Sequence, residues 1–308
     1  MQSFLNYLVF LNYICFSYAG LNYSTVQFLL ATKETRTLDI TDLSKPRSLF
    51  RPNSEIIVIV PGWTECTTLP WVEDMTKAYF DRTDMDYQII AVEWGYEANG
   101  WYYHVASIVD VIGVFVGDWL IRLAETEGFD LGRYHIVSNS IGCQVAGYLG
   151  KYVKKKSGRL LHRITALDAA GPGFFFKGPE ERLNKGDAEI IVALHTDCGW
   201  KGITIPFADV DLYPNGGIHP QPGCIESKLA LEYITEPCSH RRARLLWVES
   251  IGKRKFTGTK CDSWESYTKG ACDGNEKLDF TGDMRSIKKE HSGLYFTKTN
   301  SEAPLIID

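Results

Sequence analysis

The stretch HIVSNSIGCQVAGYLG (His135–Gly150) decides the fold, because it joins a strand to a helix with a serine between them. Arg133–Asn139 has the branched apolar character of a buried strand, and Ile141–Val153 has the small residues of a helix that packs closely on a sheet. Ser140 stands at the junction, where a sharp turn exposes one side chain at its apex. The pattern resembles G-x-S-x-G, but Ser138 replaces the first glycine.

On both sides of this unit, apolar runs of strand length alternate with runs of helical length, which predicts an α/β fold with a mostly parallel central sheet flanked by helices. The helix at His104–Gly128 is apolar enough for a membrane span, but Asp110 and Asp118 favour a core helix. The other expected strands are Glu55–Trp63, Tyr87–Trp94, Arg163–Gly173 and Ala188–Asp197, and a further helix is Arg241–Ile251.

The composition is that of one large globular domain. The chain has 308 residues, of which 44% are hydrophobic and 23% charged, and its formal net charge is −5. No linker or repeat marks a second domain, and no basic stripe runs along the chain. We therefore expect no nucleic-acid partner.

The amino terminus predicts export. Residues 1–19 carry no charge, have an apolar middle and end with Ser17 and Ala19 at the spacing of a signal-peptidase site, so we expect a signal peptide followed by a domain at 20–308. The alternative, a membrane anchor, is disfavoured because the apolar run is short and interrupted by asparagines. Asn22 begins an N-x-S sequon, a candidate glycosylation site.

The cysteines agree with a secreted protein. None has zinc-finger spacing, so disulfides are favoured over a metal site. We expect Cys224–Cys238 and Cys261–Cys272, because each pair closes a short loop. Cys66, Cys143 and Cys198 then remain, and their odd number predicts that one thiol is left over.

A serine nucleophile needs a histidine that accepts its proton and a carboxylate that orients the histidine. On a parallel sheet of this kind the expected chain order is serine, acid, histidine. Asp168 ends the strand after Ser140, and His240 lies in a loop just before a helix. Each has a simpler explanation, a turn-shaping aspartate and an exposed loop histidine, but their shared order favours a Ser140–Asp168–His240 triad.

Acyl transfer also requires donors for an oxyanion. The turn itself would supply the backbone N–H of Ile141. A second donor should come from the loop after an early strand, and PGWTEC (Pro61–Cys66) offers the N–H of Trp63. The alternative is an ordinary Pro-Gly turn.

Several blocks of the chain, in order, resemble the animal neutral lipase family, which includes pancreatic lipases and insect phospholipases A1. The resemblance spans about Leu30 to Thr299 and implies an α/β-hydrolase fold with the triad named above. The blocks are PGWTE, AVEW, SNSIGCQVAGYLG, ITALDAAGPG, RLNKGDAEIIVALHTD, VDLYPNGGIHPQPGC, CSHRRARLLWVESI and SGLYFTKT.

The chain departs from the family pattern around the predicted site. Ser138 and Asn139 stand where Gly-His is usual, Pro61 replaces a histidine, and Ala208-Asp209 stands where Gly-His is common. An extra side chain in a crowded turn costs about 1–3 kcal/mol unless the backbone relaxes. The departures bear on turnover and leave the triad in place.

Loop lengths bear on the substrate. The segment between the two cysteines before His240, Ile225–Pro237, resembles the family's lid but is short, as is the flanking loop Cys198–Ala208. Short loops resemble the phospholipase A1 arrangement. The apolar lid residues expected to touch a lipid interface are Ile225, Leu229, Leu231, Tyr233 and Ile234.

The chain ends at Asp308, so we expect a single domain without the C-terminal β-sandwich of pancreatic members, and no colipase partner. RLNKGDA (Arg182–Ala188) resembles the family's structural calcium loop, with Asn184, Asp187 and a carbonyl near Arg182 as oxygen ligands. Because Asn184 is a weaker ligand than a carboxylate, we expect no cofactor, with calcium as the alternative.

The sequence therefore predicts a secreted serine carboxylic-ester hydrolase of lipids, phospholipase A1-like or a triacylglycerol lipase. The alternative is a non-catalytic lipid or ligand carrier on the same fold, as in yolk proteins.

Overall fold

The computed structural model describes residues 25–33, 37–44, 50–51, 54–224, 237–252, 254, 256–282 and 287–307. The predicted signal peptide, the Asn22 sequon and the lid residues Ile225, Leu229, Leu231, Tyr233 and Ile234 lie outside these ranges.

An eleven-stranded sheet runs through the described residues in the order β10-β9-β11-β8-β7-β6-β5-β3-β4-β1-β2. Its centre, from β4 across to β8 and β11, is parallel, and the strands at both edges are antiparallel. The predicted mostly parallel sheet is thus confirmed. The strands are β1 (Gln27–Ala31), β2 (Thr37–Asp39), β3 (Glu55–Val60), β4 (Tyr87–Glu93), β5 (Tyr134–Asn139), β6 (Arg163–Leu167), β7 (Ile190–Leu194), β8 (Val210–Pro214), β9 (Phe256–Lys260), β10 (Lys277–Phe280) and β11 (Gly293–Thr297).

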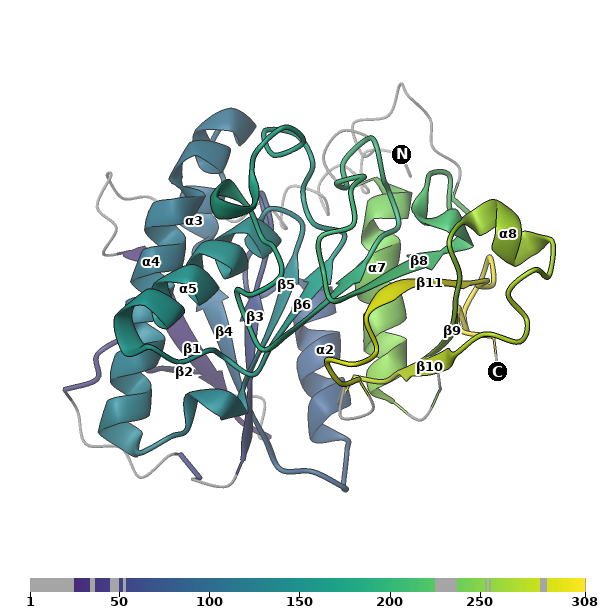
Figure 1. The fold of residues 1–308 in the computed structure, drawn as a ribbon. Coiled ribbons are helices and arrows are strands. Elements are labelled where there is room, and N and C mark those ends of the chain that lie inside the picture. The colour runs from purple at the N-terminus through teal and green to yellow at the C-terminus, as the bar shows by residue number, and fades with distance from the viewer. Residues whose placement is uncertain are drawn as a thin grey trace, which may run out of the picture.

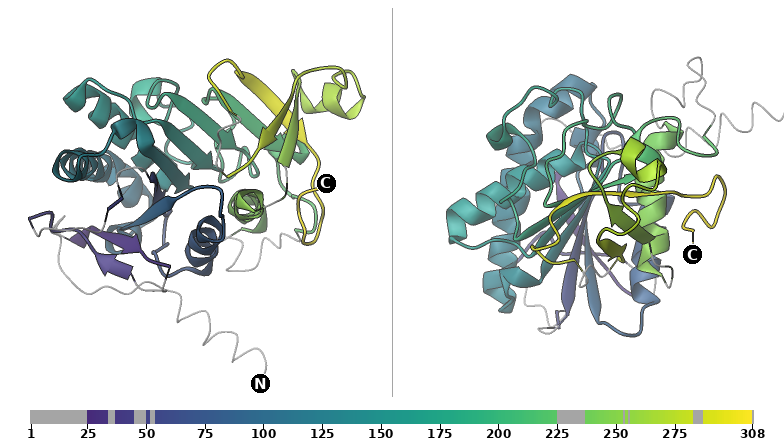
Figure 2. Two further views of the ribbon diagram at one scale, coloured as in Figure 1. Left: turned by 90° about the horizontal axis from the view of Figure 1, so that it is seen from below. Right: turned by 45° about the vertical axis from the view of Figure 1, so that its right-hand side comes forward.

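Helices cover both faces of the sheet (Figures 1 and 2). α4 (Tyr102–Glu127) and α5 (Gly142–Ser157) pack together over one face, and α2 (Pro70–Phe80) and α7 (Cys238–Ile251) over the other, so each face buries its own apolar core. Two short helices, α3 (Gly95–Ala98) and α8 (Trp264–Thr268), lie in connecting segments.

The long helix α4 is apolar and long enough to cross a membrane by length and composition alone. In the fold it lies along α5 at close range. A Cβ on Gly113 would come within 2.6 Å of Tyr148 Cβ, and one on Gly117 within 3.0 Å of the Tyr152 ring. The helix ends at Gly128, whose φ of 74° is the left-handed C-cap conformation that favours glycine.

The register of the parallel strands brings the predicted site together. Val60 of β3 pairs with Ser138 of β5, and Asn139 pairs with Leu167 of β6. Beyond the strands, Ser140 N–H donates to the Leu167 carbonyl (3.0 Å). The residues that follow β3, β5, β6 and β7 therefore lie at one edge of the sheet, where ligands of parallel sheets bind.

Both predicted disulfides, Cys224–Cys238 and Cys261–Cys272, are present. The expectation of one remaining thiol is wrong, because Cys143 and Cys198 are both free. Cys143 is buried on α5, where its Sγ contacts the Ser138 carbonyl oxygen (3.2 Å). Cys198 follows β7, with its Sγ 3.4 Å from the Ile203 carbonyl oxygen.

Candidate functional site

Ser140 occupies the turn between β5 and α5 with a φ of 53°, a strained conformation for a residue with a side chain. Gly142 is required here, because a Cβ would lie 2.4 Å from the Pro61 carbonyl oxygen. Ser138 is accommodated within β5, where its Oγ donates to the Thr165 carbonyl of β6 (3.1 Å). The buried hydroxyl of Ser138 is therefore paired with the neighbouring strand.

Asp168 follows β6 and is fully buried, with a φ of 46°. Its Oδ1 accepts the backbone N–H groups of Thr196 (2.8 Å) and Asp197 (3.0 Å), and its Oδ2 lies 2.5 Å from His240 Nδ1. Two backbone donors and one imidazole fix the carboxylate. Asp168 is thus placed to orient His240.

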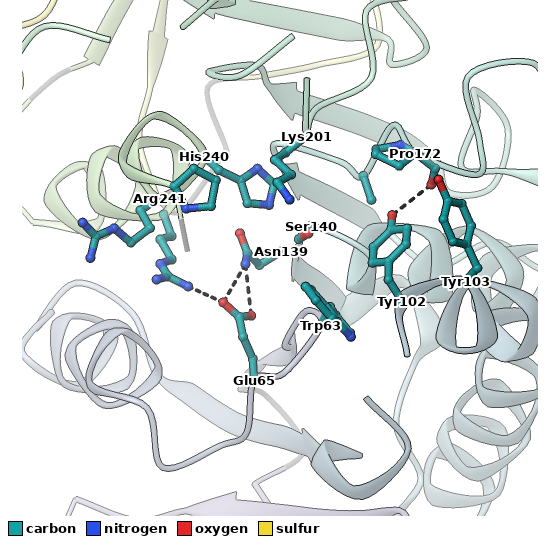
Figure 3. Close-up of a pocket in the computed structure, with 13 residues that line it drawn as sticks. Trp63, Glu65, Tyr102, Tyr103, Asn139, Ser140, Pro172, Lys201, His240 and Arg241 are labelled. Atoms are coloured by element: carbon teal, nitrogen blue, oxygen red, sulfur yellow. Dashed lines mark hydrogen bonds and ion pairs between the residues drawn. The ribbon is translucent and has the colours of Figure 1, made fainter. Parts of the chain in front are cut away.

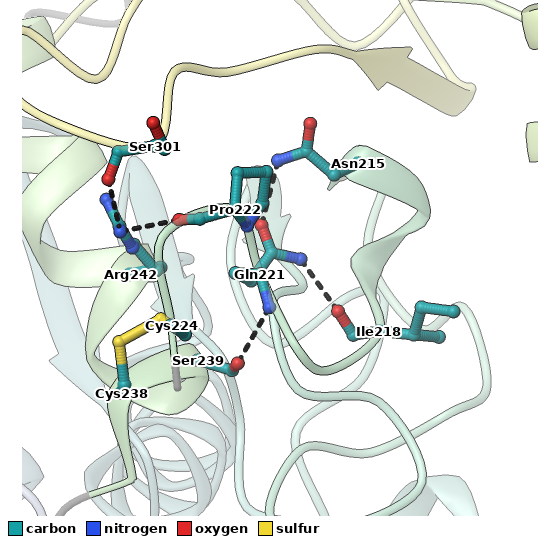
Figure 4. Close-up of a disulfide and its surroundings, with 9 residues drawn as sticks. All are labelled: Asn215, Ile218, Gln221, Pro222, Cys224, Cys238, Ser239, Arg242 and Ser301. Carbon is teal, nitrogen blue, oxygen red and sulfur yellow. Dashed lines mark hydrogen bonds between the residues drawn. A yellow bond between two sulfur atoms is a disulfide. The ribbon is translucent and has the colours of Figure 1, made fainter. Parts of the chain in front are cut away.

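The prediction that His240 lies in a loop is wrong: it lies in the first turn of α7, which begins at Cys238 after Pro237. Figure 4 shows how this helix start is held. Arg242 donates to the carbonyls of Pro222 (2.6 Å) and Ser301 (2.9 Å), next to the Cys224–Cys238 disulfide. The covalent bond and these hydrogen bonds fix the position of the imidazole.

A second buried carboxylate faces the imidazole. Asp197 follows β7, is fully buried, and has a carboxylate oxygen 2.9 Å from His219 Nδ1. One of its carboxylate oxygens also lies within 4.8 Å of ligand atoms of Asp168 and His240. Burial lowers the pKa of His240, but the hydrogen bond and charge of Asp168 and the charges of Asp197 and Glu65 outweigh burial, so the pKa is raised overall. Asp197 was not predicted as a site residue, although the predicted strand Ala188–Asp197 ends at it.

One pocket brings the predicted groups together (Figure 3). Ser140, His240 and Trp63 all line it, with Tyr102, Tyr103, Pro172 and Lys201 around them. Trp63 is held by its indole N–H, which donates to the Gly100 carbonyl (2.8 Å). Within the described part of the chain, no hydrogen bond engages the backbone N–H of Trp63 or Ile141, so both remain available as donors.

A buried ionic cluster supports the Trp63 side of the pocket. Glu65 accepts hydrogen bonds from the Asn139 side-chain amide (3.0 Å), from the Arg244 guanidinium and from the Gly62 backbone N–H. Glu65 and Arg244 side chains are 9% and 6% exposed. Burial lowers the pKa of Arg244, and the charge of Glu65 opposes that shift. Glu65 therefore ties the Trp63 loop to both the Ser140 turn and α7.

The contacts of Asn139 show what replaces the histidine that is usual before the serine. Asn139 stands at the position of the usual histidine before the serine and serves as an anchor for Glu65. Glu65 and Arg244 were not predicted as site residues. Arg244 lies one helical turn after His240, and this spacing places both side chains on one face of α7.

The predicted calcium ligands lie together, but their oxygens already have partners. Asp187 Oδ2 and the Arg182 carbonyl oxygen accept from Lys151 Nζ at 2.5 and 2.7 Å, and Asn184 Oδ1 faces Arg182 Nη1 at 3.2 Å. Calcium takes six to eight oxygens at about 2.3–2.6 Å. The residues present do not fit such an ion in this arrangement.

Known proteins resemble the chain in sequence. Lipoprotein lipase of Mus musculus is 29% identical over 93% of this chain and 65% of that protein. Lipase member H-A of Xenopus laevis is 32% identical over 80% of this chain and 53% of that protein. The chain spans between about half and two thirds of the length of these relatives.

Among solved structures, an acetyl xylan esterase from Aspergillus awamori aligns with a TM-score of 0.40 and 10% identity, over 93% of this chain and 92% of that one. The model of the lipase family matches residues 18–305, which is nearly the whole chain. The chain therefore has the α/β-hydrolase fold and belongs to the lipase family, as its resemblance to the animal neutral lipases predicted.

Proposed function

We propose that this protein is a secreted serine carboxylic-ester hydrolase that acts on lipids. The observation that carries the proposal is the 2.5 Å contact between His240 Nδ1 and buried Asp168, in a pocket that Ser140 also lines. A serine hydroxyl becomes a nucleophile when an oriented imidazole accepts its proton. The two disulfides suit the oxidising environment of a secreted protein.

In the proposed reaction, Ser140 Oγ attacks the acyl carbonyl carbon and its proton passes to His240 Nε2. Asp168 keeps the imidazole oriented and stabilises its charged form. The backbone N–H groups of Trp63 and Ile141 donate to the oxyanion, and loss of one such donor costs about 3–4 kcal/mol of barrier. His240 then protonates the leaving alkoxide, and water hydrolyses the acyl-enzyme with the same base.

A fluorophosphonate probe tests the nucleophile directly. We expect the wild-type protein to be labelled and Ser140→Ala to remain unlabelled, with Ser138→Ala as the matched control that keeps labelling. An unlabelled wild type with normal circular dichroism and cooperative unfolding would contradict the proposal.

The second candidate function is a non-catalytic lipid or ligand carrier. One observation favours it: among the described residues, no hydrogen bond joins Ser140 to His240. Hydrogen bonds of catalytic groups are often long in the absence of substrate, so the enzyme remains the first candidate. If the protein is a carrier, the wild type should bind lipid without being labelled by the fluorophosphonate. Its affinity for lipid should then be the same as that of Ser140→Ala.

Within this function we propose a phospholipid substrate of the phospholipase A1 type. Lys201 and Arg241 line the pocket and suit the anionic phosphodiester of a headgroup. Trp101 (74% exposed) lies against Tyr103 (54% exposed), which also lines the pocket, and such aromatic surface suits a lipid interface.

The substrate proposal is tested by comparing phosphatidylcholine with triolein and by determining which acyl chain is released. We expect faster hydrolysis of phosphatidylcholine, at the sn-1 position. Arg241→Gln should lower hydrolysis of phosphatidylcholine more than that of triolein. A preference of the wild type for triolein would contradict the phospholipase assignment and leave the ester hydrolase standing.

A further inference from the structure

The loop from Arg182 to Asp187 lies directly on α5, the helix that follows Ser140. A Cβ on Gly147 would come within 2.6 Å of Leu183 Cα, and one on Gly150 within 2.2 Å of the Asp187 carbonyl oxygen. The glycines thus allow backbone to approach backbone. This contact places the next helical residue, Lys151, against the loop.

The Lys151 ammonium is inserted among the loop oxygens. Its Nζ donates to Asp187 Oδ2 (2.5 Å) and to the Arg182 carbonyl (2.7 Å). The same Asp187 Oδ2 accepts the Asn184 backbone N–H (2.9 Å), which closes the loop on itself. The Lys151 side chain is 25% exposed and that of Asp187 is 7% exposed, so the ion pair is largely shielded from water.

Charge matching favours an ammonium over a dication at this position. Among the three predicted ligands, Asp187 supplies the only carboxylate, and one ammonium neutralises it. A second lysine of the same helix, Lys154, donates to the Gly186 carbonyl (3.3 Å) and uses a further loop oxygen. A calcium ion would have to displace Lys151 and then lie among these cationic side chains.

We propose that Lys151 provides the cation that holds the 182–187 loop, in place of the calcium ion implied by the family resemblance. The fold is then independent of divalent metal. The loop is also linked to the pocket, because the Gln144 side chain accepts the Leu183 N–H (3.0 Å) and donates to the Ala170 carbonyl, two residues after Asp168 (2.9 Å). The Lys151 ion pair thereby supports the scaffold on which the proposed nucleophile lies.

Thermal unfolding of the full chain tests this proposal without reference to hydrolysis. We expect the Tm of the wild type to be the same in millimolar CaCl2 and in EDTA. Lys151→Met removes the charge, leaves Asp187 buried without its cation, and should lower the Tm by about 5 °C or more. Lys155→Met, an exposed lysine one turn further along the same face, is the matched control and should leave the Tm unchanged.

A double variant shows whether the effect comes from the ion pair. In Lys151→Met/Asp187→Asn the amide oxygen still accepts the Asn184 N–H and both charges of the ion pair are gone, so part of the lost Tm should return. This variant also carries the test if Lys151→Met alone does not fold.

Two results would overturn the proposal. One is a wild-type Tm that rises with CaCl2 and falls with EDTA, since the loop would then bind the metal. The other is a Lys151→Met variant as stable as Lys155→Met. Neither result bears on whether Ser140 reacts with a fluorophosphonate.

Discussion

The two sides of the pocket differ in how they relate to the sequence patterns of the family. On one side, Asp168 and His240 keep the expected residue types and meet at 2.5 Å. On the other, Pro61 and Asn139 depart from the pattern, and a buried Glu65–Arg244 ion pair supports the Trp63 loop. The comparison indicates that the groups proposed to take part in the chemistry keep the family's residue types, while the contacts around the Trp63 loop differ from the family pattern.

The largest effect on activity should come from the side of the pocket that carries Asp168 and His240. Asp168→Asn keeps the size of the side chain but removes the charge that stabilises protonated His240, so we expect kcat to fall by about 10⁴-fold. The measurement is hydrolysis of a soluble short-chain ester. If the variant kept a tenth of wild-type activity, the neighbouring Asp197 would be the acid that supports His240.

A smaller effect on activity should come from the side of the pocket where Glu65 and Arg244 support the Trp63 loop. Glu65→Gln leaves Arg244 buried without its charge partner, which costs about 3–5 kcal/mol of stability, and it loosens the loop that carries the Trp63 N–H. We expect kcat to fall by about 10–100-fold with little change in KM, because a misplaced oxyanion donor acts on the transition state.

The double variant Glu65→Gln/Arg244→Met separates positioning from stability. It removes both charges and should recover much of the free energy of unfolding while kcat stays low. Full recovery of kcat together with stability would show that the cluster acts on folding alone.

The smallest effect should be a shift in pH dependence caused by Asp197. His240 must be neutral to accept a proton, so its raised pKa moves the loss of activity on the acid side to higher pH. Asp197→Asn removes one negative charge that faces the imidazole, leaving Asp168, Glu65 and the basic side chains around the pocket in place.

In this variant the acid limb of kcat/KM against pH should therefore move to lower pH while the plateau stays near that of the wild type. His219→Gln, which changes the partner of Asp197 and leaves the carboxylate present, is the matched control. An unchanged acid limb in Asp197→Asn would assign the raised pKa to Asp168 and Glu65.

Local pattern predicted the five parallel strands β3 to β7 and the chain order of the proposed catalytic residues, but not β8 or the other strands β1, β2, β9, β10 and β11. Strand endings predicted that Ser140 and Asp168 meet at one edge, because parallel strands end at the same side. Pairs distant in the chain could not be predicted in this way. Glu65 and Arg244 are 179 residues apart, and Lys151 meets Asp187 only because glycines let α5 approach the loop.

One local prediction failed because of contacts across the fold. His240 was placed before its helix, whereas α7 begins at Cys238, beside the disulfide and the hydrogen bonds of Arg242. Such contacts come from residues distant in the chain and could not be predicted from the local sequence.

The buried thiol of Cys143 lies next to the turn that carries Ser140, and its rate of alkylation can report local opening of the site. Burial raises the pKa of Cys143 to about 12, so the reactive thiolate is scarce at neutral pH, and the side chain is fully enclosed. Cys198 is partly exposed and has no such shield. Alkylation of Cys143 therefore requires that β5 and α5 separate, and its rate measures how often the turn that carries Ser140 comes apart.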